Sequence, residues 1–139
     1  MAVNTSPIFS KRGDIQWSPS ALLAANTAKD GTGTVATIFT AGADGAFVQR
    51  LSARSLGSNV ATVLRVFANN GSSNATAANN TLINEMTLPA TTLSEVAAQP
   101  PYELPLNFAL PAGHKILCTI GTAVAAGFAV TVFGGSYTE

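Results

Sequence analysis

The residues with the strongest intrinsic chemistry are a single histidine, His114, and a single cysteine, Cys118. A general base needs a nucleophile or an orienting carboxylate nearby, and the sequence around His114 (Leu-Pro-Ala-Gly-His-Lys) indicates neither. One histidine and one cysteine cannot form a multi-histidine or cysteine-rich zinc site, and one cysteine cannot form an internal disulfide. We therefore expect His114 to be a solvent-facing turn residue and Cys118 to be a small buried hydrophobic residue.

The carboxylates are dispersed along the chain, and no spacing selects a pair for acid–base chemistry such as glycoside hydrolysis. They are Asp14, Asp30, Asp44, Glu85, Glu95, Glu103 and Glu139. Two Asp-Gly segments, 29–33 and 43–45, faintly resemble calcium or phosphate loops. Each offers one acid, whereas a calcium loop needs several oxygen ligands, and the Gly-Lys-Ser/Thr of a phosphate loop is absent. Because Asp-Gly is a common turn dipeptide, both segments predict turns.

Three aromatic rings, Trp17, Tyr102 and Tyr137, have the amphipathic character that suits a platform for a sugar face. They are spread over most of the chain and form no motif, so packing in the core or in a subunit interface is the favoured interpretation. The sequence therefore indicates no catalytic residue, no cofactor-binding residue and no metal ligand, and we expect a protein that is not an enzyme.

The charge of the chain limits the classes of partner that it can bind. Seven Lys and Arg oppose seven Asp and Glu, and charged residues make up 10% of the chain, against about 25% in ordinary soluble domains. Nucleic-acid binding needs a dense basic patch, so we expect no nucleic-acid partner. A surface of Thr, Ser, Asn and Ala with little charge suits a free monomer poorly, which favours a protein covered by its own copies or by other partners.

The segment 116–138 is uncharged and long enough to span a bilayer. Its apolar residues alternate with small or polar ones on both sides of a Gly-flanked break at 121–127. Period-two alternation around such a break predicts a β-hairpin, so we expect no membrane association. The first residues show no basic region followed by an apolar stretch, and we expect no secretory signal.

Strand patterns dominate the remaining chain. We expect about eight strands, at residues 15–17, 34–40, 46–56, 59–68, 81–88, 102–110, 115–120 and 128–133. Their number and spacing predict an all-β fold, a single antiparallel β-sandwich or jelly roll over residues 17–139. Residues 1–16 have no sustained periodicity and are expected to be an extended N-terminal arm that contacts a neighbour or partner. Residues 20–28 predict either a single helical turn or an irregular crossing, and residues 69–80 predict a polar loop without core residues.

The alternation within the best strands also predicts which side chains form the core. The expected core residues are Val60, Leu64, Val66, Ile116, Ile120, Phe128, Val130 and Val132. The opposite face of the strand at 59–68 carries Val63, Arg65 and Phe67, so both of its faces are expected to be partly covered. In the strand at 46–56, Phe47, Gln49 and Leu51 are expected to share one face.

Four segments together resemble a known class of protein: 39–47 (Phe-Thr-Ala-Gly-Ala-Asp-Gly-Ala-Phe), 63–71 (Val-Leu-Arg-Val-Phe-Ala-Asn-Asn-Gly), 84–89 (Asn-Glu-Met-Thr-Leu-Pro) and 110–116 (Leu-Pro-Ala-Gly-His-Lys-Ile). They are similar to small jelly-roll virion proteins of tailed bacteriophages, most of all capsid decoration (cement) proteins. The similarity lies in phrases and strand order over about residues 34–137.

This resemblance implies a homotrimer that contacts the major capsid protein at local threefold positions. The protein would lie on the outer surface of the virion after synthesis in the host cytoplasm. Related jelly rolls in head fibres, tails and baseplates supply an alternative, a module that binds a host-surface glycan or receptor. A small hydrolase on a sandwich scaffold is the third and least favoured interpretation.

Overall fold

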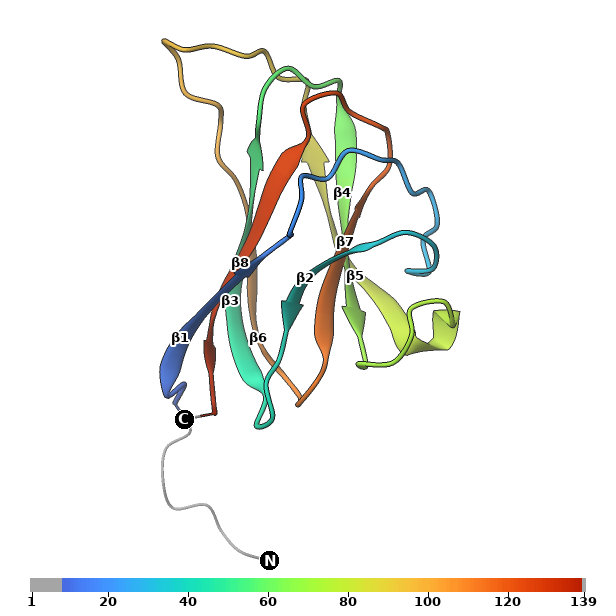
Figure 1. The fold of residues 1–139 in the computed structure, drawn as a ribbon, viewed down its shortest axis with the longest axis vertical. Helices are drawn as coiled ribbons and strands as arrows, with labels where there is room; N and C mark the ends of the chain where they lie inside the picture. Colours follow the sequence, from blue (N-terminus) through green and yellow to red (C-terminus); the bar gives the residue numbers. More distant parts are fainter. Residues whose placement is uncertain (1–8, 139) are drawn as a thin grey trace, which may run out of the picture.

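The computed structural model describes residues 9–138, which form two four-stranded antiparallel sheets packed face to face (Figure 1). The strands are β1 (Arg12–Trp17), β2 (Ala36–Thr40), β3 (Ala46–Ser55), β4 (Thr62–Asn69), β5 (Asn80–Leu88), β6 (Tyr102–Leu110), β7 (Lys115–Ile120) and β8 (Phe128–Ser136). One sheet has the order β1-β8-β3-β6 and the other has the order β2-β7-β4-β5. The predicted all-β sandwich of about eight strands is confirmed.

The pairing of the strands is that of a jelly roll. β1 pairs with β8, β2 with β7, β3 with β6 and β4 with β5, as in a long hairpin rolled up so that its two halves face each other. Every connection except β4–β5 passes from one sheet to the other. The β-hairpin predicted over residues 116–138 is therefore wrong, because β7 and β8 lie in different sheets.

The predicted core is confirmed for seven of its eight residues. Val60 is the exception, with 56% of its surface exposed. The regular pairing of β4 begins only at Thr62, and the residue beside Val60, Asn59, pairs instead with Thr91 in the β5–β6 connection. Val60 consequently lies outside the sheet, where the alternation that buries Leu64 and Val66 no longer applies.

The prediction that Phe47, Gln49 and Leu51 share one face of β3 is wrong, because the register of this strand shifts within that segment. The pairing of β3 with β6 and with β8 shifts between Val48 and Arg50. After this irregularity Leu51 faces the core, as Val48 does before it, while Phe47 is only half-buried. Phe47 and Leu51 therefore do not share a face, because an extra residue reverses the alternation of a strand.

The N-terminal arm was predicted to extend over residues 1–16, but strand β1 already begins at Arg12. β1 is an edge strand whose Ile15 lies opposite Phe133 and whose Trp17 lies opposite Thr131. Residues 12–16 thus belong to the sandwich, since their backbone extends the sheet beside β8. Residues 9–11 are exposed, and the Lys11 N–H still donates to the Ser136 carbonyl. Residues 1–8 of the predicted arm lie outside the described residues.

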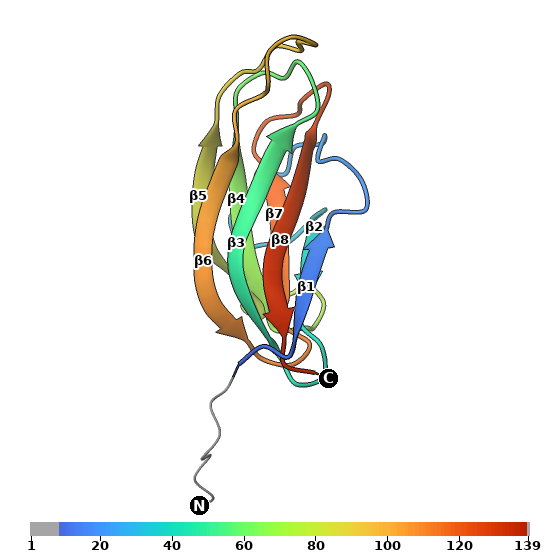
Figure 2. The ribbon, with the colours of Figure 1, turned by 90° about the vertical axis from the view of Figure 1, so that its left-hand side faces the viewer.

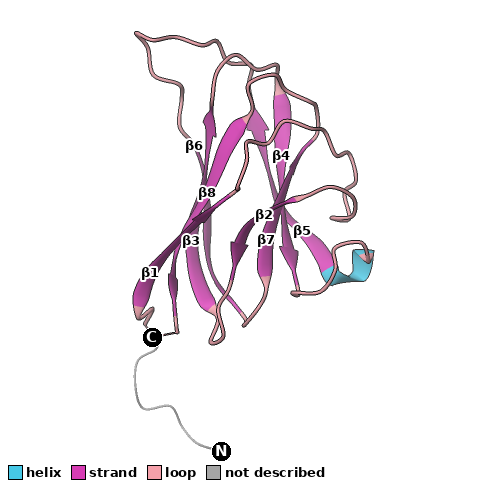
Figure 3. Cartoon of the chain, in the orientation of Figure 1, coloured by secondary structure: helices cyan, strands magenta, loops and turns pink. Residues whose placement is uncertain are grey.

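The β1–β2 connection crosses from one sheet to the other without forming a helix. Leu22 bridges to Phe128 and Ala25 bridges to Ile120, so the segment 20–28 is the irregular crossing and not the helical turn. Among residues 9–138 the one helix is a short 3₁₀ turn, η1 (Ala77–Asn79), beside the start of β5 (Figure 3). No helix in that range has the length and apolar character needed to cross a membrane.

A second apolar layer lies on the outer face of the β2-β7-β4-β5 sheet. Phe67 and Leu117 are directly opposite each other on β4 and β7 and stand outside the main core cluster, yet they are 0% and 2% exposed. The prediction that both faces of β4 are partly covered is therefore confirmed. The loop 69–80 lines a small hollow with Leu117 on this face, and hydrogen bonds join that loop to the loop 26–34.

Asparagine amides make these ties, and we call the two loops the asparagine lid. The Asn74 amide donates to the carbonyls of Gly31 and Gly33 at 3.0 and 2.9 Å. The Asn80 amide donates to the Asp30 carbonyl, and its own side-chain oxygen accepts from Asn69. Asn69 is 2% exposed, and no residue of 69–80 belongs to the hydrophobic core, which confirms the predicted polar loop without core residues.

Candidate functional site

The structure places the histidine and the cysteine where neither has an evident chemical partner among the described residues. His114 lies half-buried in the β6–β7 turn, where its backbone N–H donates to the Pro111 carbonyl. Cys118 is fully buried in β7, which confirms the predicted hydrophobic role. Burial raises the pKa of the Cys118 thiol, so it stays protonated at neutral pH and is a poor nucleophile.

Most of the described carboxylates have local partners. Arg65 Nε donates to Glu85 at 2.8 Å, Arg50 pairs with Glu103, and Asp14 accepts from Gln16. Asp30 accepts hydrogen bonds from the hydroxyl and the N–H of Thr32, which lower the pKa of its carboxyl. In the stretch from residue 9 to residue 138 no three His, Cys, Asp or Glu side chains gather to hold a metal ion.

The three aromatic rings do not form a platform. Trp17 lies on edge strand β1 with 64% of its surface exposed, whereas Tyr102 lies on β6, the opposite edge of the same sheet. Tyr102 packs against the core, as predicted. Tyr137 follows β8, and its N–H donates to the Gly45 carbonyl at the other end of the sandwich.

Four of the ten large apolar side chains that are exposed among the described residues lie in two connections at one end of the molecule. At this end, at the top of Figure 1, the β3–β4 and β5–β6 connections meet, opposite the end where β1 begins and β8 ends. The side chains are Leu56, Val60, Leu93 and Val96, with exposed fractions of 54%, 56%, 58% and 98%. We call these four residues the apolar loop end. The segments 56–61 and 89–98 that carry them contain one charged residue, Glu95.

The loops at this end are held in place by one buried side chain, that of Asn59. Its amide nitrogen donates to Ser55 Oγ at 2.9 Å and to the Gly127 carbonyl at 3.0 Å. Its amide oxygen accepts from the N–H groups of Ala126 and Gly127 at 2.8 and 2.9 Å. One amide thereby joins the β3–β4 and β7–β8 connections.

The β5–β6 connection is fixed to the same residue through the backbone. Asn59 and Thr91 exchange both of their N–H···O bonds, and the Leu93 N–H donates to Ser58 Oγ at 2.9 Å. The apolar loop end is therefore presented by loops with defined hydrogen bonds, which reduces the conformational entropy lost on docking.

Replacing Asn59 with alanine is expected to lower the free energy of unfolding by about 1–3 kcal/mol, because the change leaves buried N–H and carbonyl groups unpaired. Urea denaturation followed by circular dichroism measures the effect. Asn84→Ala is a suitable control, since Asn84 is exposed on β5 and its side chain accepts only from the N–H of the next residue. An Asn59 variant as stable as the Asn84 variant would contradict the proposed role of this amide.

The comparisons with known proteins add no relative, because no family model, curated protein or solved structure matches this chain.

The arrangement suits a contact with another protein. Exposed apolar groups that cluster on a nearly uncharged surface mark interaction sites more often than isolated ones do. Pattern analysis of the sequence missed this surface and assigned Val60 to the core. The available signal was weak: Leu93 and Val96 are apolar residues in a connection without strand periodicity.

Proposed function

We propose that the protein is a non-enzymatic structural component of a tailed-bacteriophage virion, a capsid decoration (cement) protein. In this proposal a homotrimer binds the major capsid protein on the outer capsid surface and stabilises the shell. No cofactor, nucleic acid or membrane takes part.

The observation that supports this proposal best is the apolar loop end on a jelly-roll sandwich. Jelly rolls recur in viral capsid and lectin domains, and an apolar, weakly charged tip is the kind of surface that a protein partner covers. The resemblance of segments 39–47, 63–71, 84–89 and 110–116 to phage decoration proteins points in the same direction. The residues that precede β1 are included in the proposal as a second contact with a neighbour.

A protein of this kind would act through mass action. A ligand that binds only the assembled shell stabilises that shell in proportion to the logarithm of its concentration over its Kd. Many copies, each bridging two capsomers with a modest contact, would together raise the resistance of the capsid to heat or internal pressure.

The apolar loop end can be tested directly in a capsid-binding experiment. The paired substitution Leu93→Asp with Val96→Asp is expected to weaken co-sedimentation with undecorated capsids more than tenfold, because two charges would be desolvated in the contact. Both side chains are exposed in loops, so the fold should survive the change. Ile83→Asp, at 37% exposure on β5, is the matched control and should bind as the natural protein does. Equal binding by both variants would remove the apolar loop end from the contact.

The alternative function is a head-fibre, tail or baseplate module that binds a host-surface glycan or receptor. The exposed ring of Trp17 is the observation that favours it, since an amphipathic ring suits a sugar face. Binding of the purified protein to host cells, lost in Trp17→Ala and absent for capsids, would support this module over the decoration protein.

A further inference from the structure

The free edge of β1 differs from the other sheet edges of the sandwich, which belong to β2, β5 and β6. The ladder of each of those strands is interrupted by a register shift, and β6 also contains Pro105. Such irregularities hinder the addition of a further strand to a sheet. The β1–β8 ladder runs from Arg12 to Trp17 without a shift, so among the described strands β1 has the edge best suited to strand addition.

Alternate residues of β1 present their backbone groups to this free edge. In an antiparallel ladder, successive residues of a strand direct their N–H and C=O groups by turns to its two sides. Ser18 continues the register of β1, and its N–H donates to the Val130 carbonyl, so the even-numbered residues of β1 bond to β8. Gly13, Ile15 and Trp17 therefore direct their N–H and C=O groups outward, where no described residue bonds to them.

The side chains of these residues leave the free edge accessible. Gln16 faces the opposite sheet, because its amide donates to the Thr40 carbonyl at 3.0 Å and accepts from the Thr40 N–H at 2.9 Å. Alternation then places Ile15 and Trp17 on the outer face, where 54% and 64% of their surfaces are exposed. A Cβ added to Gly13 would meet no atom within 4 Å. The outer side of this edge is thus open and apolar.

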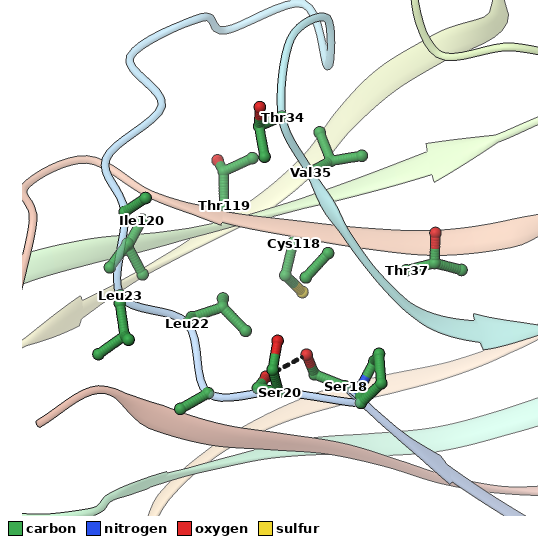
Figure 4. A pocket seen from close by; sticks show the side chains of 14 residues that line it. Ser18, Ser20, Leu22, Leu23, Thr34, Val35, Thr37, Cys118, Thr119 and Ile120 are labelled. Carbon is green, nitrogen blue, oxygen red and sulfur yellow. Dashed lines mark hydrogen bonds between the residues drawn. The ribbon is translucent and has the colours of Figure 1, made fainter.

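The accessible edge ends where the chain enters the β1–β2 connection. There the Ser18 hydroxyl donates to the Ser20 carbonyl, and the connection crosses from one sheet to the other beside β7 (Figure 4). Residues 13–17 are therefore the segment of β1 to which a strand could be added. We call this segment the β1 edge.

The residues that precede the described chain have the composition of such a strand. Residues 1–8 (Met-Ala-Val-Asn-Thr-Ser-Pro-Ile) carry no charged side chain, and their β-branched Val3 and Thr5 favour an extended strand. Pro7 has no N–H and therefore marks the end of the part that can pair, so residues 2–6 match the β1 edge in length. Eight extended residues reach about 26 Å, which exceeds the width of about 14 Å of a four-stranded sheet.

The described chain begins on the side of β1 that faces away from its own free edge. A Cβ on Gly135 would collide with the side chain of Ser10, so Ser10 lies against β8. The Lys11 N–H also donates to β8, at the Ser136 carbonyl. Figure 2 shows the segment 9–11 passing below the end of β8, away from the exposed side of β1. This direction favours another copy of the chain as the source of a strand added to the β1 edge.

We propose that residues 2–6 of a second copy of this chain add to the β1 edge as an extra strand. Main-chain hydrogen bonds to Gly13, Ile15 and Trp17 would hold the added strand. The donor segment and the acceptor edge are different surfaces, so each copy donates one strand and accepts one, and three copies about a threefold axis close a ring. This inference rests on the homotrimer of the proposed function and identifies the contact that closes it.

Hydrogen exchange of individual amides, followed by NMR, tests the added strand. The N–H groups of Ile15 and Trp17 should exchange at least about tenfold more slowly in the full chain than in a variant lacking residues 2–8, because only the full chain supplies acceptors for them. The N–H groups of Asp14 and Gln16 bond to β8 in both proteins and are the internal control. The deletion removes no residue of either sheet, and light scattering should show a trimer for the full chain and a single chain for the variant.

Two substitutions at one position separate the backbone of the β1 edge from its side chain. Ile15→Pro removes the outward N–H, whereas Ile15→Ala keeps it, so the proline variant should be a monomer and the alanine variant should still form trimers. The proline variant retains its donor segment, and the variant lacking residues 2–8 retains its β1 edge. A mixture of these two monomers should therefore form a complex of two chains.

A trimer that persists without residues 2–8 overturns this inference, as do amides of Ile15 and Trp17 that exchange equally fast with and without that segment. Slow exchange of these amides in a full chain that is a monomer also overturns it, because the segment would then pair with its own β1. Each of these results leaves the decoration function to be decided separately, by the rupture temperature of decorated and stripped capsids.

Discussion

Replacing Phe67 with alanine is expected to lower the free energy of unfolding by about 3–5 kcal/mol. Phe67 is fully buried although it faces away from the main core, on the outer side of the β2-β7-β4-β5 sheet. We attribute this burial to the asparagine lid. Removal of the ring would leave a cavity that the lid cannot fill without breaking the amide ties of Asn74 and Asn80.

Urea denaturation of the Phe67 variant, followed by circular dichroism, measures this effect. Leu82 is the matched control, because it lies opposite Phe67 on β5 but is 36% exposed. Leu82→Ala should cost about 1 kcal/mol or less, since the side chain is already partly in water. A loss of less than about 1 kcal/mol for Phe67→Ala would show that the lid does not enclose a second apolar layer.

Leu64→Ala is expected to cost about 2–5 kcal/mol, because Leu64 lies at the centre of the main core between the two sheets. It is fully buried on β4, opposite Met86 on β5 and Ile120 on β7. Val60→Ala, four residues earlier in the sequence, should be nearly neutral because Val60 is exposed at the apolar loop end.

Comparing these two variants tests whether the buried part of β4 begins after Val60. Thermal and urea denaturation midpoints of the two variants provide the measurement. An unchanged midpoint for Leu64→Ala would reject the inward orientation of β4, and a large loss for Val60→Ala would return that residue to the core.

The strands and the main core could be predicted because the alternation of buried apolar residues with more exposed ones along a strand is a local signal in the sequence. Leu64 and Val66 on β4, and Val130 and Val132 on β8, each alternate with residues that are more exposed. Burial of one face of a sheet imposes that period directly on the sequence. The predicted interval 102–110 coincides with β6, and its Pro105 lies on an edge strand, where a residue without an N–H is tolerated.

The partners of the strands could not be predicted in the same way. Residues 41–45 have the length of a hairpin loop, yet β2 and β3 lie in different sheets, so loop length did not reveal the sheet to which each strand belongs. The register shift near Arg50 and the pairing of residues 12–16 with β8 are long-range properties. They depend on segments more than fifty residues away in the sequence.

The apolar loop end was harder still to anticipate. The apolar loop end is assembled from connections that are brought together by Asn59, whose contacts extend to Gly127. By contrast, the buried state of Cys118 followed from its place in an alternating apolar segment.

We propose that this protein stabilises a capsid as a trimer, and the rupture temperature of the shell is the measurement on which this proposal depends. Capsids that carry the protein in this proposal would be stripped of it and heated in parallel with capsids to which it has been restored. Light scattering of the purified protein should give a mass near three times 14.1 kDa. Stripped capsids are expected to rupture at a lower temperature. The natural protein, but not the Leu93→Asp, Val96→Asp variant, is expected to restore the original value. A protein that is a monomer in solution and leaves the rupture temperature unchanged would contradict the account.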